Sequence, residues 1–434
     1  MSTRRIERLE IEGLFGRFNY AIGLGVEKRG LKILTSPNGY GKSTILRMID
    51  AFARGEYEYF TNEKFDSVRF ILSGGLTVEL ISKAGDVLIK CEDKSVLIRG
   101  GDNKRNKKGF FVEPPLESRV ARSRFLRDEL AEGFVDKDIF YEICKELRSY
   151  ADFLENESWL EEIREELKVI SISTNRLKTN LPDVSSRSDK EGVNIFTVDY
   201  LARKLKTRIQ QEIGRQFNEG RQLEASFPTR LIAAMRRATE TSQERPIQDE
   251  IDRVKDYETR FIKLGLVHGP GSEDQIKALN VESLGDPEVV VLRTYLSDIL
   301  KKFKLLDELV IRLEVFCNSI NELLAFKSIS TSEDDGIVVR VSDREGESIP
   351  LSLLSSGEQH LIVIIGELVF NTDENCLVLI DEPEISFHPE WQEKFLGILE
   401  NIQRVNAFSV LVSTHSPMLI GDRWDSVIEL ASQN

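Results

Sequence analysis

The sequence Leu31-Lys-Ile-Leu-Thr-Ser-Pro-Asn-Gly-Tyr-Gly-Lys-Ser-Thr-Ile-Leu46 decides the fold of this chain. Its first five residues form a largely apolar run, which we interpret as a buried strand, and a helix is expected to begin at Lys42. A turn that contains two glycines joins the two. In such a unit the unpaired backbone N–H groups of the first helical turn and the helix dipole converge on an anion. The stretch therefore predicts a loop that binds phosphate groups.

The loop follows the pattern G-x-x-x-x-G-K-[ST] except at its first position, where Ser36 replaces glycine. Serine can form this turn if its φ stays negative. Lys42 is expected to reach the β- and γ-phosphates as a point charge, and the Ser43 hydroxyl is expected to bind Mg²⁺. The predicted nucleotide-binding residues are Ser36, Asn38, Gly39, Tyr40, Gly41, Lys42, Ser43 and Thr44.

Composition limits the class of protein. Of 434 residues, 41% are hydrophobic, which suffices for one large core or two modest ones. The chain has no run of about 18 apolar residues and no signal-peptide core, so we expect a cytoplasmic protein without a membrane partner. The four cysteines lack paired spacing and support neither a zinc ribbon nor a disulfide framework. The net charge of −14 argues against nucleic-acid binding over the whole surface, although local basic patches can bind it.

Hydrophobic periodicity predicts the elements around the loop. Strand-like runs occupy residues 6–11, 18–24 and 31–35. Four alternating runs then predict an antiparallel meander, at residues 68–72, 76–81, 87–91 and 95–98. Further on, helices are expected at about residues 198–213, after Pro228 and over residues 292–326. Because they keep no strict heptad for long, we expect a compact helical insertion and not an extended coiled coil.

The last hundred residues contain two apolar runs that are typical of central parallel strands, at residues 376–380 and 408–412. The first ends in Asp381-Glu382-Pro383. Asp381 can hold Mg²⁺, and Glu382 can orient and deprotonate a water that attacks the γ-phosphate. The second run ends before His415, which is placed to donate a hydrogen bond to the γ-phosphate. The predicted catalytic residues are therefore Glu382, His415 and Lys42.

A polar sequence opens another apolar helix, after a hairpin expected at residues 337–353. It comprises Ser355, Ser356, Gly357, Glu358 and Gln359. If the backbone N–H groups of this helix N-terminus have no partners within the chain, the segment predicts a second anion site. Simple helix capping is the alternative interpretation.

Together these motifs resemble an ABC-type ATPase head of the kind found in SMC and DNA-repair ATPases. The resemblance implies an α/β fold with a mixed sheet flanked by helices and an antiparallel β meander, and it implies ATP and Mg²⁺ as cofactors. It also implies a homodimer that sandwiches two ATP molecules head to tail. In that dimer Ser355 and Gly357, within the signature residues 355–359, contact the γ-phosphate bound by the partner. Higher oligomers are left open.

The resemblance also suggests domain limits. We expect an N-terminal lobe at 1–115, a helical insertion at 116–334 whose strand 168–176 returns to the head, and a C-terminal lobe at 335–434. Two departures from the family stand out. Ile385-Ser-Phe-His388 replaces the Ser-Ala-Leu-Asp of transporter heads. No glutamine lies between Lys42 and Gln210 to contact Mg²⁺, so Asn175 at a strand end is the expected substitute ligand.

Three functions fit this head, because a fold does not specify its output. The segments 382–389 and 421–425 resemble ATPase subunits of Septu-type and PARIS-type antiphage systems. They favour a sensor that controls a separate effector, expected to be a nuclease from the same operon, with a nucleic acid or a phage-derived molecule as candidate trigger. A DNA-repair or chromosome-maintenance ATPase that clamps DNA is the alternative. A transporter ATPase fits less well. Lys42 and Gly357 are 315 positions apart, which is too many for the compact helical domain of a transporter head.

Overall fold

The structure is a computed structural model, and it describes residues 3–25, 29–100, 158–172, 178–181, 193–238, 247–266, 284–342 and 348–433. The chain forms two compact units. Unit 1 consists of Met1–Ser173, Thr372–Ile385 and Asn406–Asn434. Unit 2 consists of Thr174–Asn371 and Ser386–Val405. Each unit is described by itself.

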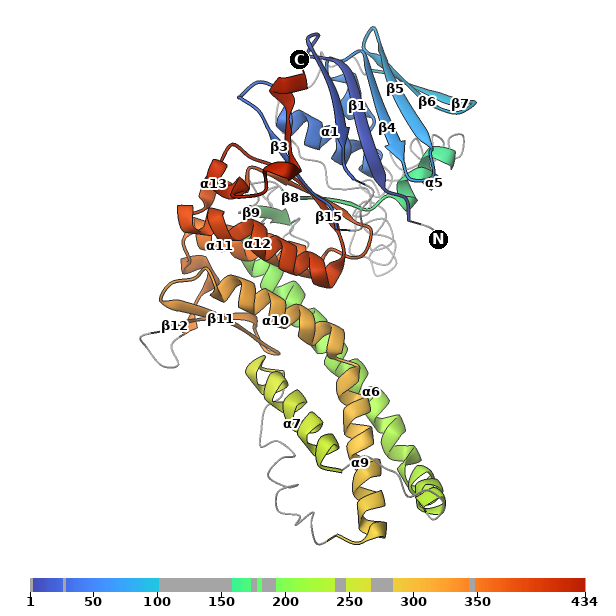
Figure 1. The fold of residues 1–434 in the computed structure, drawn as a ribbon, viewed down its shortest axis with the longest axis vertical. Coiled ribbons are helices and arrows are strands. Elements are labelled where there is room, and N and C mark those ends of the chain that lie inside the picture. The colour runs from blue at the N-terminus through green and yellow to red at the C-terminus, as the bar shows by residue number, and fades with distance from the viewer. Residues whose placement is uncertain are drawn as a thin grey trace, which may run out of the picture. The chain divides into compact units, whose positions relative to one another are not determined.

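An antiparallel sheet forms one layer of unit 1 (Figure 1). Its strands are β1 (Ile6–Leu14), β2 (Phe18–Gly23), β4 (Ser67–Leu72), β5 (Thr77–Lys83), β6 (Asp86–Cys91) and β7 (Lys94–Ile98). They are ordered β2-β1-β4-β5-β6-β7, so the predicted meander from β4 to β7 is confirmed. Buried and more exposed residues alternate along β6, as expected for a sheet with one face on the core.

A parallel sheet forms the second layer and contains the predicted central strands. Its strands are β3 (Leu31–Thr35), β8 (Val169–Ile172), β14 (Leu377–Asp381), β15 (Ser409–Ser413) and β16 (Val427–Glu429). The order is β16-β3-β15-β14-β8. Asp381 lies opposite Ser413, and Ser413 lies opposite Leu34. The carboxyl ends of β3, β14 and β15 therefore meet at one edge, where open α/β sheets bind ligands.

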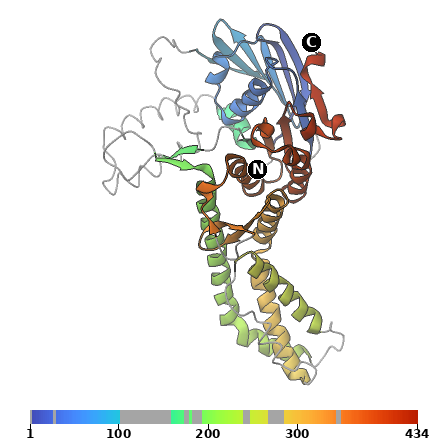
Figure 2. The same ribbon diagram turned by 90° about the vertical axis from the view of Figure 1, so that its left-hand side faces the viewer.

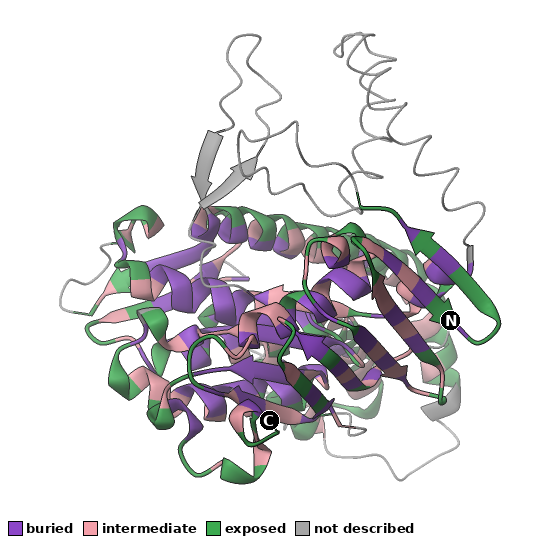
Figure 3. Cartoon of the chain, turned by 90° about the horizontal axis from the view of Figure 1, so that it is seen from above, coloured by how far each residue is buried: buried purple, intermediate pink, exposed green. Residues whose placement is uncertain are grey.

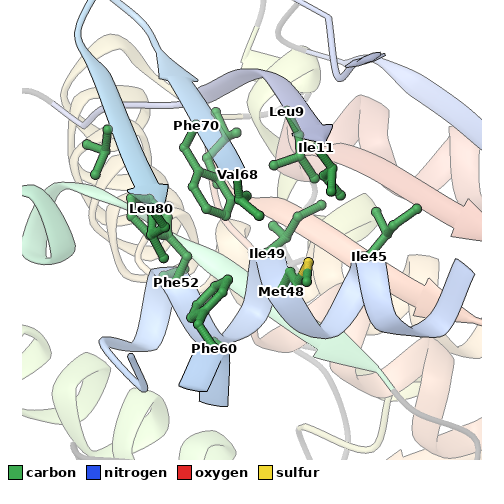
Figure 4. Packing of buried hydrophobic residues seen from close by; sticks show 14 of the residues in the cluster. Leu9, Ile11, Ile45, Met48, Ile49, Phe52, Phe60, Val68, Phe70 and Leu80 are labelled. Carbon is green, nitrogen blue, oxygen red and sulfur yellow. The ribbon is translucent and has the colours of Figure 1, made fainter. Parts of the chain in front are cut away.

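Helix α1 (Lys42–Arg54) packs its apolar face against the antiparallel sheet (Figure 4). Ile45, Met48, Ile49 and Phe52 of α1 are fully or almost fully buried. The ring of Phe52 stacks on that of Phe70 from β4, with centroids 3.9 Å apart. This core fixes the helix whose N-terminus follows the phosphate-binding loop. The shorter helices of unit 1 are α2 (Glu58–Thr61), α5 (Ser158–Glu166), α13 (Pro417–Ile420), η4 (Trp424–Ser426) and η5 (Leu430–Gln433).

Unit 2 is mainly helical. Its helices are α6 (Thr197–Ala238), α7 (Ile247–Lys263), α9 (Asp286–Lys304), α10 (Asp307–Asn321), α11 (Ser356–Phe370) and nearly all of α12 (Pro389–Asn406). Helices α6 and α7 both pack on α9 (Figure 2). A small apolar core between α7 and α9 consists of Val254, Leu292, Leu296 and Leu300. Helix α9 has both buried and exposed residues, as expected for a helix with one face on the core, whereas α11 is buried along nearly its whole length from Gln359 to Phe370. Figure 3 colours each described residue by its burial.

Two helix predictions for unit 2 were wrong. The separate helices expected before and after Pro228 form the single helix α6. Beyond the proline, Arg230 forms an ion pair with the buried Asp298 of α9, and such packing can outweigh the cost of proline. The long helix expected at residues 292–326 is interrupted instead. Leu306 N donates to Phe303 O over 2.9 Å, a tight turn that separates α9 from α10.

Two small sheets complete unit 2. One pairs β9 (Lys178–Leu181) with β10 (Val193–Phe196). The other contains β11 (Lys327–Ser332), β12 (Gly336–Val341) and β13 (Ser348–Ile349). The predicted hairpin is present, but its second strand stops after two residues and the 3₁₀ turn η2 (Leu351–Leu353) follows. No helix in the described part of the chain has both the length and the hydrophobicity that a bilayer span requires.

Candidate functional site

The loop between β3 and α1 has the backbone that a phosphate-binding turn requires. Gly39 and Gly41 have φ values of +88° and +89°, in the left-handed region that favours glycine. A Cβ atom at Gly41 would also lie 2.9 Å from Leu14 Cδ2. The loop's positive φ values fall on these glycines and not on Ser36, so serine meets the condition for replacing the first glycine of the pattern.

Lys42, the first residue of α1, is only 6% exposed. Its Nζ donates to Ser36 O over 3.3 Å and lies 2.5 Å from His415 Nε2. Burial lowers the pKa of Lys42, and the negative charges of Glu382, Asp381 and Glu384 oppose that effect without cancelling it. The ammonium group is therefore held inside the loop among acidic side chains.

A cluster of oxygen atoms joins α1 to the ends of β14 and β15. Ser43 Oγ donates to Asp381 Oδ1 over 3.2 Å, and Ser413 Oγ donates to the same oxygen over 2.5 Å. A hydroxyl beside a carboxylate suits Mg²⁺, which is usually bound by one or two protein oxygens together with substrate phosphates and water. Within the described residues, no group of three or more His, Cys, Asp or Glu side chains forms a metal cage. Asn175, the predicted substitute ligand, lies outside the described residues.

Glu382 and His415 face each other across the same edge. Glu382 Oε1 lies 3.4 Å from His415 Nε2, so this ring nitrogen is close to both Glu382 and Lys42. Glu382 has φ +46°, an unfavourable conformation for a residue with a side chain. A hydrogen bond of 3.0 Å from its N–H to Ser413 O holds it there. The structure thus brings together all three predicted catalytic residues.

Glu384 also belongs to this edge, although it was not among the predicted site residues. Its Oε1 accepts hydrogen bonds from Thr414 Oγ1 at 2.6 Å and from His415 N at 2.8 Å. The sequence carried one signal for it, an acidic residue directly after Pro383 at a strand end. That signal is weak, because acidic residues are common in exposed turns.

The remaining predicted nucleotide-binding residues line the loop. Asn38 is exposed, whereas Thr44 is half-buried in the first turn of α1. Tyr40 is half-buried, and its ring stacks on Phe18 with centroids 5.1 Å apart. Its carbonyl accepts a hydrogen bond from Tyr20 Oη over 2.8 Å. These contacts attach the middle of the loop to β2.

The signature residues lie in unit 2, at the start of α11. Ser355 is the N-cap, and its N–H and hydroxyl donate to Glu358 Oε2 over 2.8 and 2.9 Å. Lys327 Nζ donates to both carboxylate oxygens of Glu358, at 2.7 and 2.9 Å. The alternative of helix capping is therefore confirmed, because Glu358 forms a capping box with Ser355. The box pairs the N–H groups of Ser355 and Glu358, and the anion site at this helix N-terminus stays a prediction.

Gln359 and the two residues between Ser355 and Glu358 complete this segment. Gln359 is buried, and its Nε2 donates to Leu354 O over 2.9 Å. Ser356 is exposed and Gly357 is half-buried. The exposed surface of the segment thus consists chiefly of Ser355 and Ser356, while the buried side chain of Gln359 holds the segment through its hydrogen bond to Leu354 O.

The sheet topology and the site define a class. A phosphate-binding loop after β3, acidic residues after β14 and a histidine after β15, combined with the antiparallel layer, form an ABC-type P-loop ATPase head. Residues 37–421 match the family described as "AAA domain, putative AbiEii toxin, Type IV TA system". The chain belongs to this family.

Individual proteins resemble the chain less. Protein ea59 of Escherichia phage lambda is 34% identical over 67 residues, which are 15% of this chain and 13% of that protein. The SMC head domain from Thermotoga maritima has 13% identity and a TM-score of 0.38, with 98% of this chain and 94% of that chain covered. An SMC head domain with a coiled coil and joint from Pyrococcus yayanosii has 14% identity and a TM-score of 0.36, with 98% and 95% covered.

Proposed function

We propose that this protein binds ATP with Mg²⁺ and hydrolyses it to ADP and phosphate. The observation that carries the proposal is the position of His415 Nε2 near both Lys42 Nζ and Glu382 Oε1, at 2.5 and 3.4 Å. Residues 373 positions apart in the sequence meet there. A cation that binds phosphates and a carboxylate base are groups that catalyse phosphoryl transfer to water, and the ring of His415 adds a hydrogen-bond donor beside them.

Each residue has a defined task in this reaction. Lys42 and the backbone N–H groups of the loop bind the β- and γ-phosphates. Glu382 orients the attacking water and accepts its proton as the water oxygen bonds to the γ-phosphorus. The bond between that phosphorus and the bridging oxygen breaks, and ADP leaves with the electron pair. His415 hydrogen-bonds the γ-phosphate, while Ser43 and Asp381 would hold Mg²⁺, which neutralises the developing charge.

Signature residues 355–359 are assigned to a second copy's site in this proposal. The resemblance to ABC-type heads supports a homodimer in which Ser355 and Gly357 contact the γ-phosphate bound by the partner. The exposure of Ser355 and Ser356 is compatible with that role. For Ser355 to donate to phosphate, its hydroxyl must leave Glu358 Oε2, which it contacts at 2.9 Å.

The cellular role that we propose is that of a cytoplasmic sensor in a two-component antiphage system. Segments 382–389 and 421–425 support it through their resemblance to Septu-type and PARIS-type ATPase subunits. Nucleotide state would govern a separate effector, proposed to be a nuclease, after a nucleic acid or phage-derived trigger is sensed. Such control requires the effector to bind the two states with affinities that differ by about 1–3 kcal/mol.

A DNA-clamping repair ATPase is the second candidate. Helix α6 favours it, because its 42 residues extend over about 63 Å and α9 packs along it. A rod of this kind resembles the start of a DNA-bridging arm more than a docking platform for an effector.

Two experiments test the proposal. Phosphate release from Mg²⁺-ATP should be measurable for the purified wild type and absent for Lys42→Ala. For the cellular role, cells that express the chain with and without its operon neighbour are challenged with phage. Protection should require both genes. Protection by this gene alone, together with nuclease activity of the purified protein, would contradict the two-component role.

A further inference from the structure

Glu384 joins the two loops that carry the proposed catalytic residues. It lies two residues after Glu382, yet its Oε1 accepts hydrogen bonds from the segment after β15. The donors are Thr414 Oγ1 at 2.6 Å and His415 N at 2.8 Å. A single carboxylate oxygen therefore fixes both the side chain before His415 and the backbone of His415 itself.

The segment around Glu384 is built from a short chain of hydrogen bonds. Thr414 is fully buried, and its Oγ1 also accepts from Ser416 N over 2.9 Å. Because residues 414–416 are all tied to this chain, the backbone of His415 has little freedom to rotate. Its ring, 35% exposed, is thereby held where Nε2 contacts Lys42 and Glu382.

Glu384 also belongs to the turn that holds Glu382. The backbone at Glu382 has a positive φ, which a glutamate adopts only when its surroundings impose it. The turn is closed by Ile385 N, which donates to Glu382 O over 3.3 Å, and by the bond from Glu382 N to Ser413 O. Glu384 lies inside this turn and attaches it to Thr414 and His415.

The second carboxylate oxygen of Glu384 has a different environment. Oε2 is buried and has no hydrogen-bond partner within the described residues. A buried, unpaired carboxylate oxygen is unfavourable for stability. The glutamate is therefore better explained by what Oε1 does for the geometry of the site than by a contribution to folding.

We propose that Glu384 is a positioning residue that sets the distance between His415 and the Lys42–Glu382 pair. The inference rests on the proposed ATPase function and adds a residue to it. Within the described residues, Glu384 forms no hydrogen bond or ion pair with the side chains of Lys42 or Glu382, although its negative charge favours the charged form of Lys42. Its effect on the geometry of the site therefore runs through His415 and the turn. Its loss should misplace the groups that act on the γ-phosphate and leave the phosphate-binding loop intact.

Three variants separate these effects. Glu384→Ala removes the acceptor, and kcat should fall about 10–100-fold, as for other residues that orient catalytic groups. The dissociation constant for ATP should change less than about threefold, because Lys42 and the loop remain. Glu384→Gln keeps an acceptor oxygen and should restore most of kcat. Thr414→Val keeps the shape of the side chain but removes one of the two donors to Glu384, so it should also lower kcat. This variant tests the same link if Glu384→Ala does not fold.

A spectroscopic measurement tests the positioning without hydrolysis. The chain has four histidines, so the NMR signals of the His415 ring can be assigned by their loss in His415→Gln. Glu384→Ala should shift these signals and leave those of the other histidines in place. Glu390→Ala is the matched control, because Glu390 is an exposed glutamate that pairs with Lys394 on the surface of α12. It should change neither kcat nor the His415 signals.

The outcomes distinguish this inference from the proposed function. If wild type hydrolyses ATP and folded Glu384→Ala has wild-type kcat or unchanged His415 signals, the positioning role is wrong and the ATPase proposal stands. A parallel loss of ATP affinity and kcat that Glu384→Gln does not restore would also overturn it, because the role would then be structural. If wild type does not hydrolyse ATP, the ATPase proposal fails, and the His415 signals alone decide whether Glu384 positions the ring.

Discussion

The hydroxyl of Ser43 donates to Asp381 Oδ1 over 3.2 Å, although 338 residues separate the two in the sequence. The contact joins the first turn of α1 to the carboxyl end of β14. Both groups are oxygen ligands of the kind that Mg²⁺ prefers, and both lie beside the loop that would hold the phosphates. The proposed metal site is thus a product of the parallel sheet, which aligns the ends of distant strands.

Asp381→Asn should weaken the response to Mg²⁺. The amide keeps the shape of the side chain but loses the negative charge that attracts the ion. We expect the Mg²⁺ concentration that gives half-maximal ATPase activity to rise at least about tenfold. Titration of Mg²⁺ at fixed ATP measures it. Asp373→Asn, which changes an exposed carboxylate paired with Lys168, is the control and should not shift the titration.

As pH rises, ATP affinity should fall at a lower pH than it would if Lys42 had the pKa of an ordinary lysine. Burial lowers the pKa of Lys42 in the free protein below its usual 10.5, so the ammonium that binds phosphate is lost at a lower pH. Affinity is full below this lowered pKa and falls as pH rises through it. Lys42→Arg should bind more weakly but lose this pH dependence, because arginine stays charged. Equilibrium binding of a fluorescent ATP analogue between pH 7 and pH 10 measures it, and equal pH profiles for the two proteins would contradict the assignment.

Lys327→Met should destabilise unit 2. Burial alone would raise the pKa of Glu358, but hydrogen bonds from Lys327 and Ser355 outweigh it and hold the pKa below its ordinary value. Removing the cation leaves a largely buried carboxylate without its main partner, at a cost of about 1–3 kcal/mol near pH 7. Because the pKa is lowered in the folded state, the stabilisation exists above the unfolded pKa and disappears as pH falls through the folded one.

Urea unfolding of this variant at several pH values checks the prediction. The difference from wild type should be largest near neutral pH and should shrink in acid. Lys394→Met is the matched control, because Lys394 pairs with the exposed Glu390 and should contribute little. A loss of stability that is equal at all pH values would contradict the ion-pair explanation.

A mixture of two inactive variants should recover activity if the site is shared between copies. Lys42→Ala disables the phosphate loop, and Gly357→Asp places a negative charge where the signature segment would meet the γ-phosphate. At contact distance such a like-charge pair costs well over about 1 kcal/mol. Each variant alone should be inactive, whereas mixed dimers should contain one intact composite site. Full activity from a wild-type preparation shown by light scattering to be monomeric would contradict the shared site.

Local sequence patterns predicted the central part of the fold well. The two central parallel strands β14 and β15 were visible as short continuous apolar runs, since both of their faces are buried, and both were predicted within one residue at each end. The edge strand β16 was not predicted. The meander was visible because its strands alternate. The positions of the candidate residues Asp381 and His415 at or after the ends of these strands followed from the same reasoning.

Contacts between distant parts of the chain could not be predicted in this way. Helix α6 continues through Pro228 because α9 packs beside it, which no local pattern reveals. Glu384 was missed because its partners follow β15. The spacing Ser-x-x-Glu allowed helix capping as the alternative interpretation of residues 355–359, and the capping box of Ser355 and Glu358 confirms that alternative.

The most direct test of the ATPase proposal is the turnover of ATP by Glu382→Gln. Glutamine keeps the size and hydrogen-bonding capacity of the side chain but cannot accept the proton of the attacking water. Purified wild type and Glu382→Gln are compared for equilibrium binding of ATP and for phosphate release in the presence of Mg²⁺. We expect Glu382→Gln to bind ATP as wild type does and to release phosphate at least about 100-fold more slowly. Phosphate release by this variant at the wild-type rate would contradict the assignment of Glu382 as the catalytic base.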